Sequence, residues 1–225
     1  MPAPRPTRLF HITAIANLPS LCEAGALLAK NAGVAGGIRY QNIAYQGAQG
    51  SRSRRRVPDP PGGSVHDYVP FYFAPRSPML FTINSGNVAG CAWRQADIVH
   101  LETTVERVLG AGQPFVFYDR NATLAFSESY TDLARLDDVV AWDLLTEAPQ
   151  LDGYCRFWQN KNTPDRYSDR MERRQAEFLV RDRVPLKRMT RIGVIDAAKQ
   201  THVQSLLDSV AIEMSVEVMP SWYYF

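Results

Sequence analysis

Short runs of β-branched and aromatic residues recur along the chain and predict strands. They lie at residues 10–13, 69–73, 79–84, 98–103, 115–118 and 192–195. Near the C-terminus, apolar and polar side chains alternate between residues 212 and 218, which is the pattern of a half-exposed strand. The apolar positions of that stretch are Ile212, Met214, Val216 and Val218.

Fewer segments have helical spacing. Asn17 is a candidate N-cap for a helix whose apolar positions follow the helical period. These positions are Leu18, Leu21, Cys22 and Leu28. Asp137 is a candidate cap for a second helix, running through Val139, Val140 and Leu144.

The glycine-rich stretch at residues 33–37 follows the first predicted helix rather than a strand. That context is wrong for a dinucleotide-binding glycine loop, so we interpret it as a turn. Strands and helices do not alternate regularly, which favours an α+β fold over a doubly wound sheet. No shift in composition separates two domains along the 225 residues.

One carboxylate stands out because it lies in an apolar, strand-like run directly behind two arginines. Glu177 follows Arg173 and Arg174 and precedes Phe178, Leu179 and Val180. In an extended segment Glu177 and Leu179 share one face, and Phe178 and Val180 share the other. Glutamate is rarely buried without a partner, so this side chain either faces water at an edge or points into a cleft.

The net charge of +2 hides a strong asymmetry. Residues 156–191 hold eleven Lys or Arg against five Asp or Glu, whereas residues 128–152 hold seven acidic residues against Arg135 alone. A second basic run consists of Arg52, Arg54, Arg55 and Arg56. Such runs are either solvated surface or, near aromatic side chains, a surface for single-stranded nucleic acid.

Several broad classes of protein are disfavoured. No apolar run approaches the roughly 20 residues of a membrane span, and the N-terminus lacks the apolar core of a secretory signal. The cysteines, Cys22, Cys91 and Cys155, are odd in number and lack metal-like spacing, which favours a reduced, cytoplasmic setting. The histidines are scattered, so we expect no metal. They are His11, His66, His100 and His202.

Four segments, in order, resemble a known family. They are Phe10-His11-Ile12-Thr13 followed by Asn17-Leu18; Ile43-Ala44-Tyr45 with Arg52 seven positions after the tyrosine; the long stretch from His66 to Leu80; and Arg173 to Val180. The terminal Trp222-Tyr223-Tyr224 fits as well. These segments are similar to DarT-type toxins, the ADP-ribosyltransferases that modify bases in single-stranded DNA. The stretch from His66 to Leu80 looks more like the thymidine-modifying branch than the guanine-modifying one.

The resemblance carries expectations about fold and partners. It implies a single ADP-ribosyltransferase domain over residues 1–225, with an α+β fold in which two small β-sheets flank an NAD cleft. It implies a toxin that transfers ADP-ribose from NAD to thymidine in single-stranded DNA, and a macrodomain antitoxin that removes the modification. No membrane and no metal are expected to take part.

The resemblance also assigns residues to roles. Glu177 would stabilise the cationic sugar formed as nicotinamide leaves, and Arg52 would act at the reacting centre or hold phosphate. His11, Thr13, Tyr72 and Arg76 would bind NAD. The residues expected at the DNA are Arg54, Arg55, Arg56 and Asn121.

Three alternatives remain open from the sequence. An ADP-ribosyltransferase could act on protein or RNA instead of DNA. A non-catalytic module could bind single strands through its basic and aromatic loops. A DNA nuclease would need a divalent metal.

Overall fold

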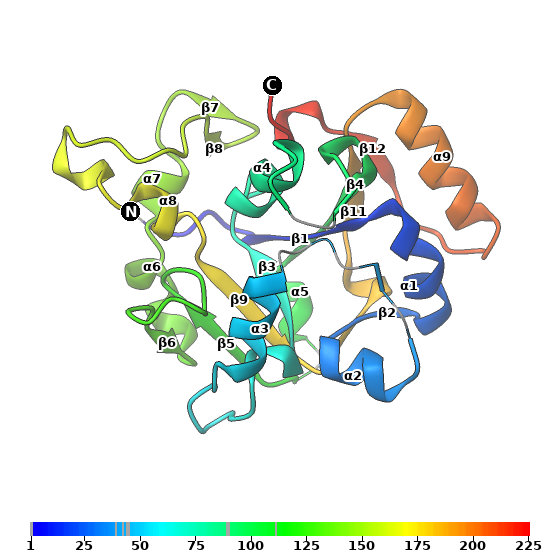
Figure 1. Cartoon of the computed structure of the whole chain (residues 1–225), viewed down its shortest axis with the longest axis horizontal. Coiled ribbons are helices and arrows are strands. Elements are labelled where there is room, and N and C mark those ends of the chain that lie inside the picture. The colour runs from blue at the N-terminus through cyan, green and yellow to red at the C-terminus, as the bar shows by residue number, and fades with distance from the viewer. Residues whose placement is uncertain (1, 39, 42, 44–45, 89–90, 111) are drawn as a thin grey trace.

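The computed structural model describes residues 2–38, 40, 41, 43, 46–88, 91–110 and 112–225 (Figure 1). Within this part of the chain, eight strands form one sheet in the order β12-β11-β4-β1-β3-β9-β5-β6, and two small sheets pair β10 with β2 and β7 with β8. The strands are β1 (Arg8–Ala14), β2 (Ala26–Leu28), β3 (Tyr68–Tyr72), β4 (Ile98–Thr104), β5 (Phe115–Tyr118), β6 (Ser129–Tyr130), β7 (Gln150–Leu151), β8 (Tyr154–Cys155), β9 (Glu177–Arg181), β10 (Arg183–Pro185), β11 (Arg191–Val194) and β12 (Val216–Val218).

The helices lie around this sheet. They are α1 (Leu18–Ala24), α2 (Lys30–Ala35), α3 (Gln46–Arg54), α4 (Pro78–Asn84), α5 (Val105–Leu109), α6 (Leu136–Val139), α7 (Trp142–Leu145), α8 (Arg170–Arg173) and α9 (Ala197–Asp208). Helix α9 runs along one outer edge beside β12, and α3 lies in front of β9 in the view of Figure 1. The expected α+β class with small sheets is confirmed, with a large sheet alongside them.

The large sheet is sparsely paired in its middle, between β1 and β3, and we call this junction the seam. Strands β1 and β4 pair over the whole length of β1, whereas β1 and β3 share one register position, Phe10 with Tyr72. Beyond that position the His11 side chain bridges the two strands, with its Nδ1 2.8 Å from the carbonyl oxygen of Pro70. The sheet therefore consists of two four-stranded halves that meet at this seam.

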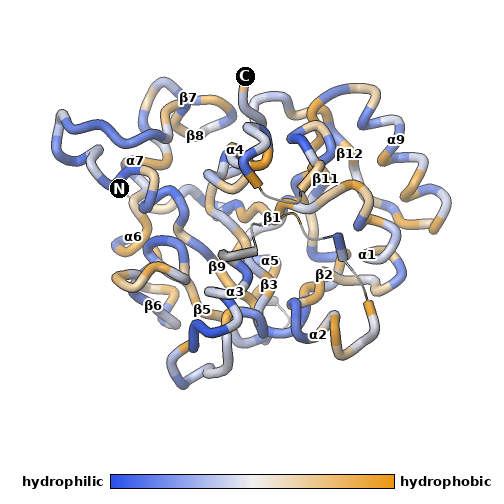
Figure 2. The backbone as a smooth tube through the Cα atoms, in the orientation of Figure 1, coloured by the Kyte–Doolittle hydropathy of each residue, from blue (hydrophilic) through white to orange (hydrophobic). Residues whose placement is uncertain are grey.

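The β9 run alternates as its sequence predicts. Phe178 and Val180 belong to the main hydrophobic core, and Phe178 stacks on the rings of Phe115 and Phe117. Leu179 faces the other way and joins a smaller cluster that includes Tyr118. Both faces of this half of the sheet are therefore covered by apolar side chains. By contrast, the loop between β8 and α8 is almost wholly hydrophilic (Figure 2).

Residues 79–84 form helix α4 and not the expected strand. The strand prediction was wrong because an apolar run of this length fits a strand or a helix, and the two residues before it favour a helix. Ser77 caps the helix by accepting a hydrogen bond from the backbone N–H of Leu80, and Pro78 occupies the first turn. A serine cap followed by proline is a strong signal for a helix start.

The first predicted helix is shorter than expected. Helix α1 ends at Gly25, whose positive φ of 61° terminates it, and Leu28 lies in β2. Asn17 occupies the cap position without capping the helix through its side chain. Its amide instead contacts the Thr13 hydroxyl and the backbone of Gln41, so the predicted cap position is confirmed but the side chain makes other hydrogen bonds.

Three other boundaries differ from expectation. Residues 33–35 are the end of helix α2, and the turn begins after them. The expected helix after Asp137 is divided into α6 and α7, with Asp137 inside the first turn of α6. Of the alternating stretch at 212–218, the structure keeps 216–218 as β12. Short elements of this kind are decided by packing more than by local pattern.

The C-terminal aromatic residues pack on the half of the large sheet that contains β1, β4 and β11. Trp222 packs edge-on against Phe10, and the Tyr223 hydroxyl donates to the backbone oxygens of Ile98 and Gly193. Gly193 allows the Trp222 ring to lie this close to β11, since a Cβ there would lie 2.1 Å from the ring. Among the described residues, no helix is both long enough and apolar enough to cross a membrane.

Candidate active site

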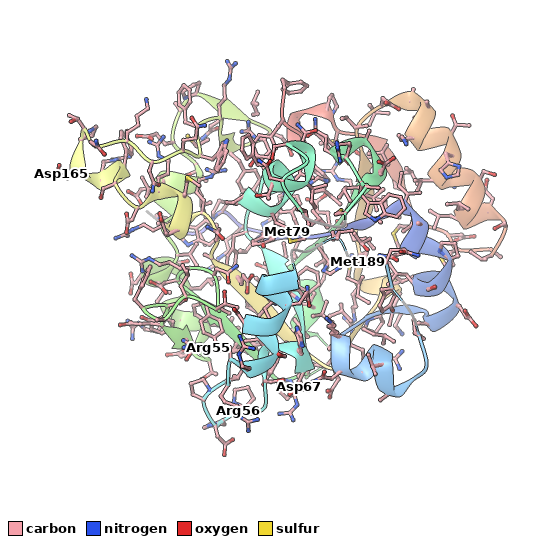
Figure 3. The ribbon with its side chains drawn as sticks, viewed as in Figure 1. Arg55, Arg56, Asp67, Met79, Asp165 and Met189 are labelled. Atoms are coloured by element: carbon pink, nitrogen blue, oxygen red, sulfur yellow. The ribbon has the colours of Figure 1, made fainter. Side chains whose placement is uncertain are left out.

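A cavity of about 680 Å³ opens at the seam between the two halves of the sheet. Its walls come from β1, β3, β9 and α3, and from the loop that follows β5. Met79 of α4, at the centre of the molecule in Figure 3, lines it as well. The volume lies within the range of about 300–1,000 Å³ that is usual for small-molecule sites.

Glu177 is the first residue of β9 and lies on the cavity wall, with 1% of its surface exposed. The strand register places it between Tyr72 of β3 and Tyr118 of β5. Cross-strand neighbours point to the same face of a sheet, so both tyrosines flank the carboxylate. The cleft-facing alternative for Glu177 therefore applies, and the edge alternative does not.

Two donors hold the carboxylate. Arg52 Nη1, from α3, lies 2.9 Å from Oε1 and 3.1 Å from Oε2 of Glu177. Asn121 Nδ2, from the loop after β5, lies 3.2 Å from Oε1. Burial by itself would lower the pKa of Arg52, but the charge of Glu177, the hydrogen bond to it and the nearby Tyr72 and Tyr118 together outweigh burial and raise that pKa. The pair is thus a charged, hydrogen-bonded couple that is shielded from water.

His11 faces the cavity from β1. A backbone carbonyl can only accept, so the contact with Pro70 requires a proton on Nδ1 and leaves Nε2 as an acceptor when the ring is neutral. Burial lowers the pKa of His11, the bond to Pro70 opposes that change, and the nearby Arg52 lowers the pKa further. The imidazole is therefore neutral at physiological pH.

Thr13 and Tyr72 complete the group of predicted residues on the cavity wall. The Thr13 hydroxyl accepts from Asn17 Nδ2 at 3.0 Å, which ties β1 to the start of α1. Burial and the adjacent Glu177 raise the pKa of Tyr72, so its hydroxyl stays protonated as a donor. The structure thus brings together five residues that lie far apart in the sequence. They are His11, Thr13, Arg52, Tyr72 and Glu177, joined by Asn121.

The other predicted residues lie outside the cavity. Arg54 and Arg56 are exposed, and Arg55 is half-buried with its Nη2 donating to the backbone of Ser127. Figure 3 shows Arg55 and Arg56 at the lower end of α3. Arg76 is buried away from the cavity and donates to the Cys155 carbonyl at 2.9 Å. Ala44 and Tyr45, from the second family segment, lie outside the described residues.

Sequence reasoning missed a polar group at the α3 end of the cavity. His66 Nε2 lies 3.1 Å from Gln49 Oε1, which also accepts from Lys30 Nζ at 2.8 Å. Burial, followed by the charges of Lys30 and Arg52, lowers the pKa of His66 to about 4. The sequence analysis assigns His66 no role in the site, although His66 begins the long family segment that ends at Leu80. That position was the signal that could have identified it.

The cavity is mainly apolar, and its lining holds the ion pair of Arg52 and Glu177 and, bound to Gln49, the ammonium group of Lys30. No cluster of three or more His, Cys, Asp or Glu side chains suited to a metal occurs in the part of the chain that the structure describes. A fixed carboxylate in a shielded cavity stabilises positive charge that develops on a bound sugar. The site therefore defines a class: enzymes that transfer a glycosyl group through a cationic sugar.

Comparisons with known proteins identify the member of this class. The family model described as ssDNA thymidine ADP-ribosyltransferase, DarT, matches residues 10–224. A DNA ADP-ribosyl transferase from Thermus sp. (strain 2.9) is 36% identical over 226 residues, covering 98% of each protein. The chain belongs to the DarT family of single-stranded-DNA thymidine ADP-ribosyltransferases, as the resemblance predicted.

Solved structures agree in fold over the whole chain. The structure of Thermus sp. 2.9 DarT in complex with ADP-ribosylated ssDNA matches with a TM-score of 0.86 and 33% identity, covering 100% of this chain and 99% of that one. The complex of the same protein with NAD+ matches with a TM-score of 0.82 and 32% identity, covering 99% and 100%. The ADP-ribosyltransferase-like fold is confirmed by these matches.

Proposed function

We propose that this protein transfers ADP-ribose from NAD to a thymidine base in single-stranded DNA and releases nicotinamide. The observation that carries the proposal is the buried Glu177 carboxylate, held by Arg52 on the wall of a cavity large enough for a nucleotide. The related Thermus protein has been solved with NAD+ and with ADP-ribosylated ssDNA, which supports the same pair of substrates here.

The reaction exchanges one bond from carbon to nitrogen for another. The bond between ribose C1′ and nicotinamide breaks, and nicotinamide leaves with the electron pair. Positive charge then builds on the ribose, and Glu177 stabilises it because the carboxylate is already fixed by its donors. A thymine ring nitrogen forms the new bond to C1′, and its proton is released to solvent.

The NAD-facing wall consists of His11, Thr13 and Tyr72. A neutral His11 offers Nε2 as an acceptor for a ribose hydroxyl, and Tyr72 offers a donor beside Glu177. Arg52 lies nearest the reacting centre, where its charge also favours loss of the proton from the acceptor base.

Access explains a preference for single strands. A thymine nitrogen that is used in base pairing cannot attack the ribose, so the base must be unpaired or extruded. Arg54 and Arg56 are exposed at the end of α3, next to the arginine that holds Glu177. They suit contacts with DNA phosphates on either side of the modified base.

Membership of the family supports a proposal for the biological setting. We propose that residues 1–225 act as one ADP-ribosyltransferase domain, since the strands of the large sheet span residues 8 to 218. We also propose a cytoplasmic toxin whose mark on DNA is removed by a macrodomain antitoxin. A purified macrodomain hydrolase that leaves the modified oligonucleotide unchanged would contradict this pairing.

Mass spectrometry of a thymine-containing oligonucleotide, incubated with enzyme and NAD, tests the reaction. We expect the mass of one ADP-ribose on the oligonucleotide, none on a matched strand without thymine, and none with Glu177→Ala. RNA and total protein serve as competing acceptors in the same tube. Label on protein or RNA alone would refute DNA as the substrate, and label with Glu177→Ala would refute the catalytic role.

A further inference from the structure

Asn121 lies at the cavity with its amide fixed in one orientation. Its Oδ1 accepts from the backbone N–H of Thr123 at 3.0 Å and from the Thr123 hydroxyl at 2.6 Å. A backbone N–H can only donate, so the atom that faces it must be the oxygen and not the nitrogen. The hydrogen-bond network therefore settles which way the amide points.

This orientation directs the nitrogen at Glu177. Asn121 Nδ2 lies 3.2 Å from Oε1 of the carboxylate, the same oxygen that lies 2.9 Å from Arg52 Nη1. The two donors come from separate parts of the chain, one from the loop after β5 and one from α3. Glu177 is thus held from two directions, which fixes the rotation of its carboxylate plane.

We propose that Asn121 is a positioning residue for Glu177, and that Thr123 fixes which way the Asn121 amide points. This inference rests on the proposed transfer reaction. Asn121 and Arg52 share Oε1, which leaves Oε2, with the longer 3.1 Å contact to Arg52, as the oxygen that meets the sugar. On this view the carbonyl oxygen of Asn121 cannot read a base edge, because Thr123 occupies it.

Because Asn121 contributes by holding Glu177 in place, its loss should lower the rate of transfer and leave the binding of NAD and DNA nearly unchanged. A misplacement of about 1 Å at a reacting centre can cost on the order of 10²-fold in rate. For Asn121→Ala we expect kcat for transfer to fall by about 10- to 100-fold, while KM for NAD and for the oligonucleotide changes less than about threefold. Thr123→Val keeps the backbone donor and loses the hydroxyl, so a smaller loss in kcat is expected.

Asn160 provides a matched control on the exposed surface. Its Oδ1 accepts from the backbone N–H of Met171 at 2.7 Å, and its Nδ2 donates to Glu172 at 3.1 Å. The arrangement of amide, carboxylate and backbone is the same, but Asn160 does not line the cavity. Asn160→Asp and Asn160→Ala should leave kcat and both KM values unchanged.

The variant Asn121→Asp adds a test by pH. In this variant the introduced carboxylate would be adjacent to that of Glu177, and such a pair keeps one proton at pH values where a single carboxylate would be ionised. The acid limb of the profile of kcat against pH should therefore move to higher pH. Asn160→Asp should not move it. This isosteric variant and Thr123→Val keep the proposal testable if Asn121→Ala does not fold.

The outcomes separate the alternatives. A raised KM for the oligonucleotide with unchanged kcat would mean that Asn121 reads the base, and would overturn the proposal. An unchanged kcat together with an unmoved acid limb would overturn it as well. Absence of transfer by the wild-type protein is a different result, because it refutes the proposed function and not the role of Asn121.

Discussion

At the scale of single residues, the site depends on charge removed from water. Glu177 and Arg52 form a pair in which the carboxylate is almost fully buried. Leaving either partner alone would strand a buried charge, which costs about 3–5 kcal/mol in typical proteins. The pair is thus a structural element of the cavity wall, and in the proposed reaction it is also the chemical centre.

Glu177→Gln keeps the shape of the side chain and removes its charge. We expect transfer to slow by roughly 10²- to 10³-fold, because an uncharged amide cannot stabilise a developing cation. The rate of oligonucleotide modification measures the effect. Glu213→Gln, on the exposed stretch before β12, is the matched control and should be fully active.

His100 should make stability depend on pH. It is fully buried in β4, donates from Nε2 to the Pro75 carbonyl, and burial lowers its pKa to about 4. The unfolded chain then binds a proton between about pH 6.5 and 4 that the folded protein does not, so stability falls as pH falls through that window. Urea unfolding at pH 7 and 4.5 should show that wild type loses about 2–3 kcal/mol more than His100→Gln. An equal loss in both proteins would contradict this assignment.

At the scale of elements, close approaches decide where strands and helices lie. Strand β11 passes under the Trp222 ring at Gly193, and β1 meets β3 at one position before His11 bridges the gap. The packing of Trp222 on Gly193 covers one half of the sheet, and the short pairing of β1 with β3 leaves room for the cavity. Neither contact can be inferred from the residues of one strand.

Gly193→Ala should destabilise the protein without touching the cavity. A methyl group there would lie 2.1 Å from the Trp222 ring, so the ring or the strand must move. Overpacking of this kind typically costs about 1–3 kcal/mol. Thermal unfolding measures the loss. In Gly36→Ala the new methyl group meets its nearest atom at 3.4 Å, so a melting temperature as low as that of Gly193→Ala would argue against the steric cause.

At the scale of the whole molecule, modest net charge coexists with a basic edge near the cavity. Arg54 and Arg56 are exposed beyond Arg52, whereas Arg55 is tied to Ser127. Exposed arginines attract phosphates without regard to sequence. These exposed arginines support the proposed DNA contacts at the edge of the cavity.

The double variant Arg54→Gln and Arg56→Gln should weaken binding of single-stranded DNA. Each lost phosphate contact lowers the slope of log affinity against log salt by about 0.7 for single strands. Fluorescence anisotropy over a salt series measures that slope. A double variant at Arg94 and Arg156, which are also exposed, is the control. Equal slopes in both variants would place the DNA elsewhere.

The extent of sequence-based prediction differs between these scales. Most strands were predictable, because runs of β-branched and apolar residues such as 98–103 favour extended backbone, and alternation fixes the two faces of the Glu177 run. Helix α4 was predictable only from Ser77 and Pro78, its cap and first-turn residues, because its apolar run alone fits a strand or a helix. The family resemblance supplied Glu177, Arg52 and His11, but not the contacts among them.

The sequence by itself determined the mixed α and β class, the alternation of β9 and the family to which the chain belongs. Only the tertiary structure decided that Asn121 points its nitrogen at Glu177, that His66 lines the cavity, and that Arg76 lies away from it. The physical reason is the separation along the sequence of the residues that determine each feature. Strand alternation is set by neighbouring residues, whereas the surroundings of a buried charge are set by segments from β1, α3, β5 and β9 that meet only after folding.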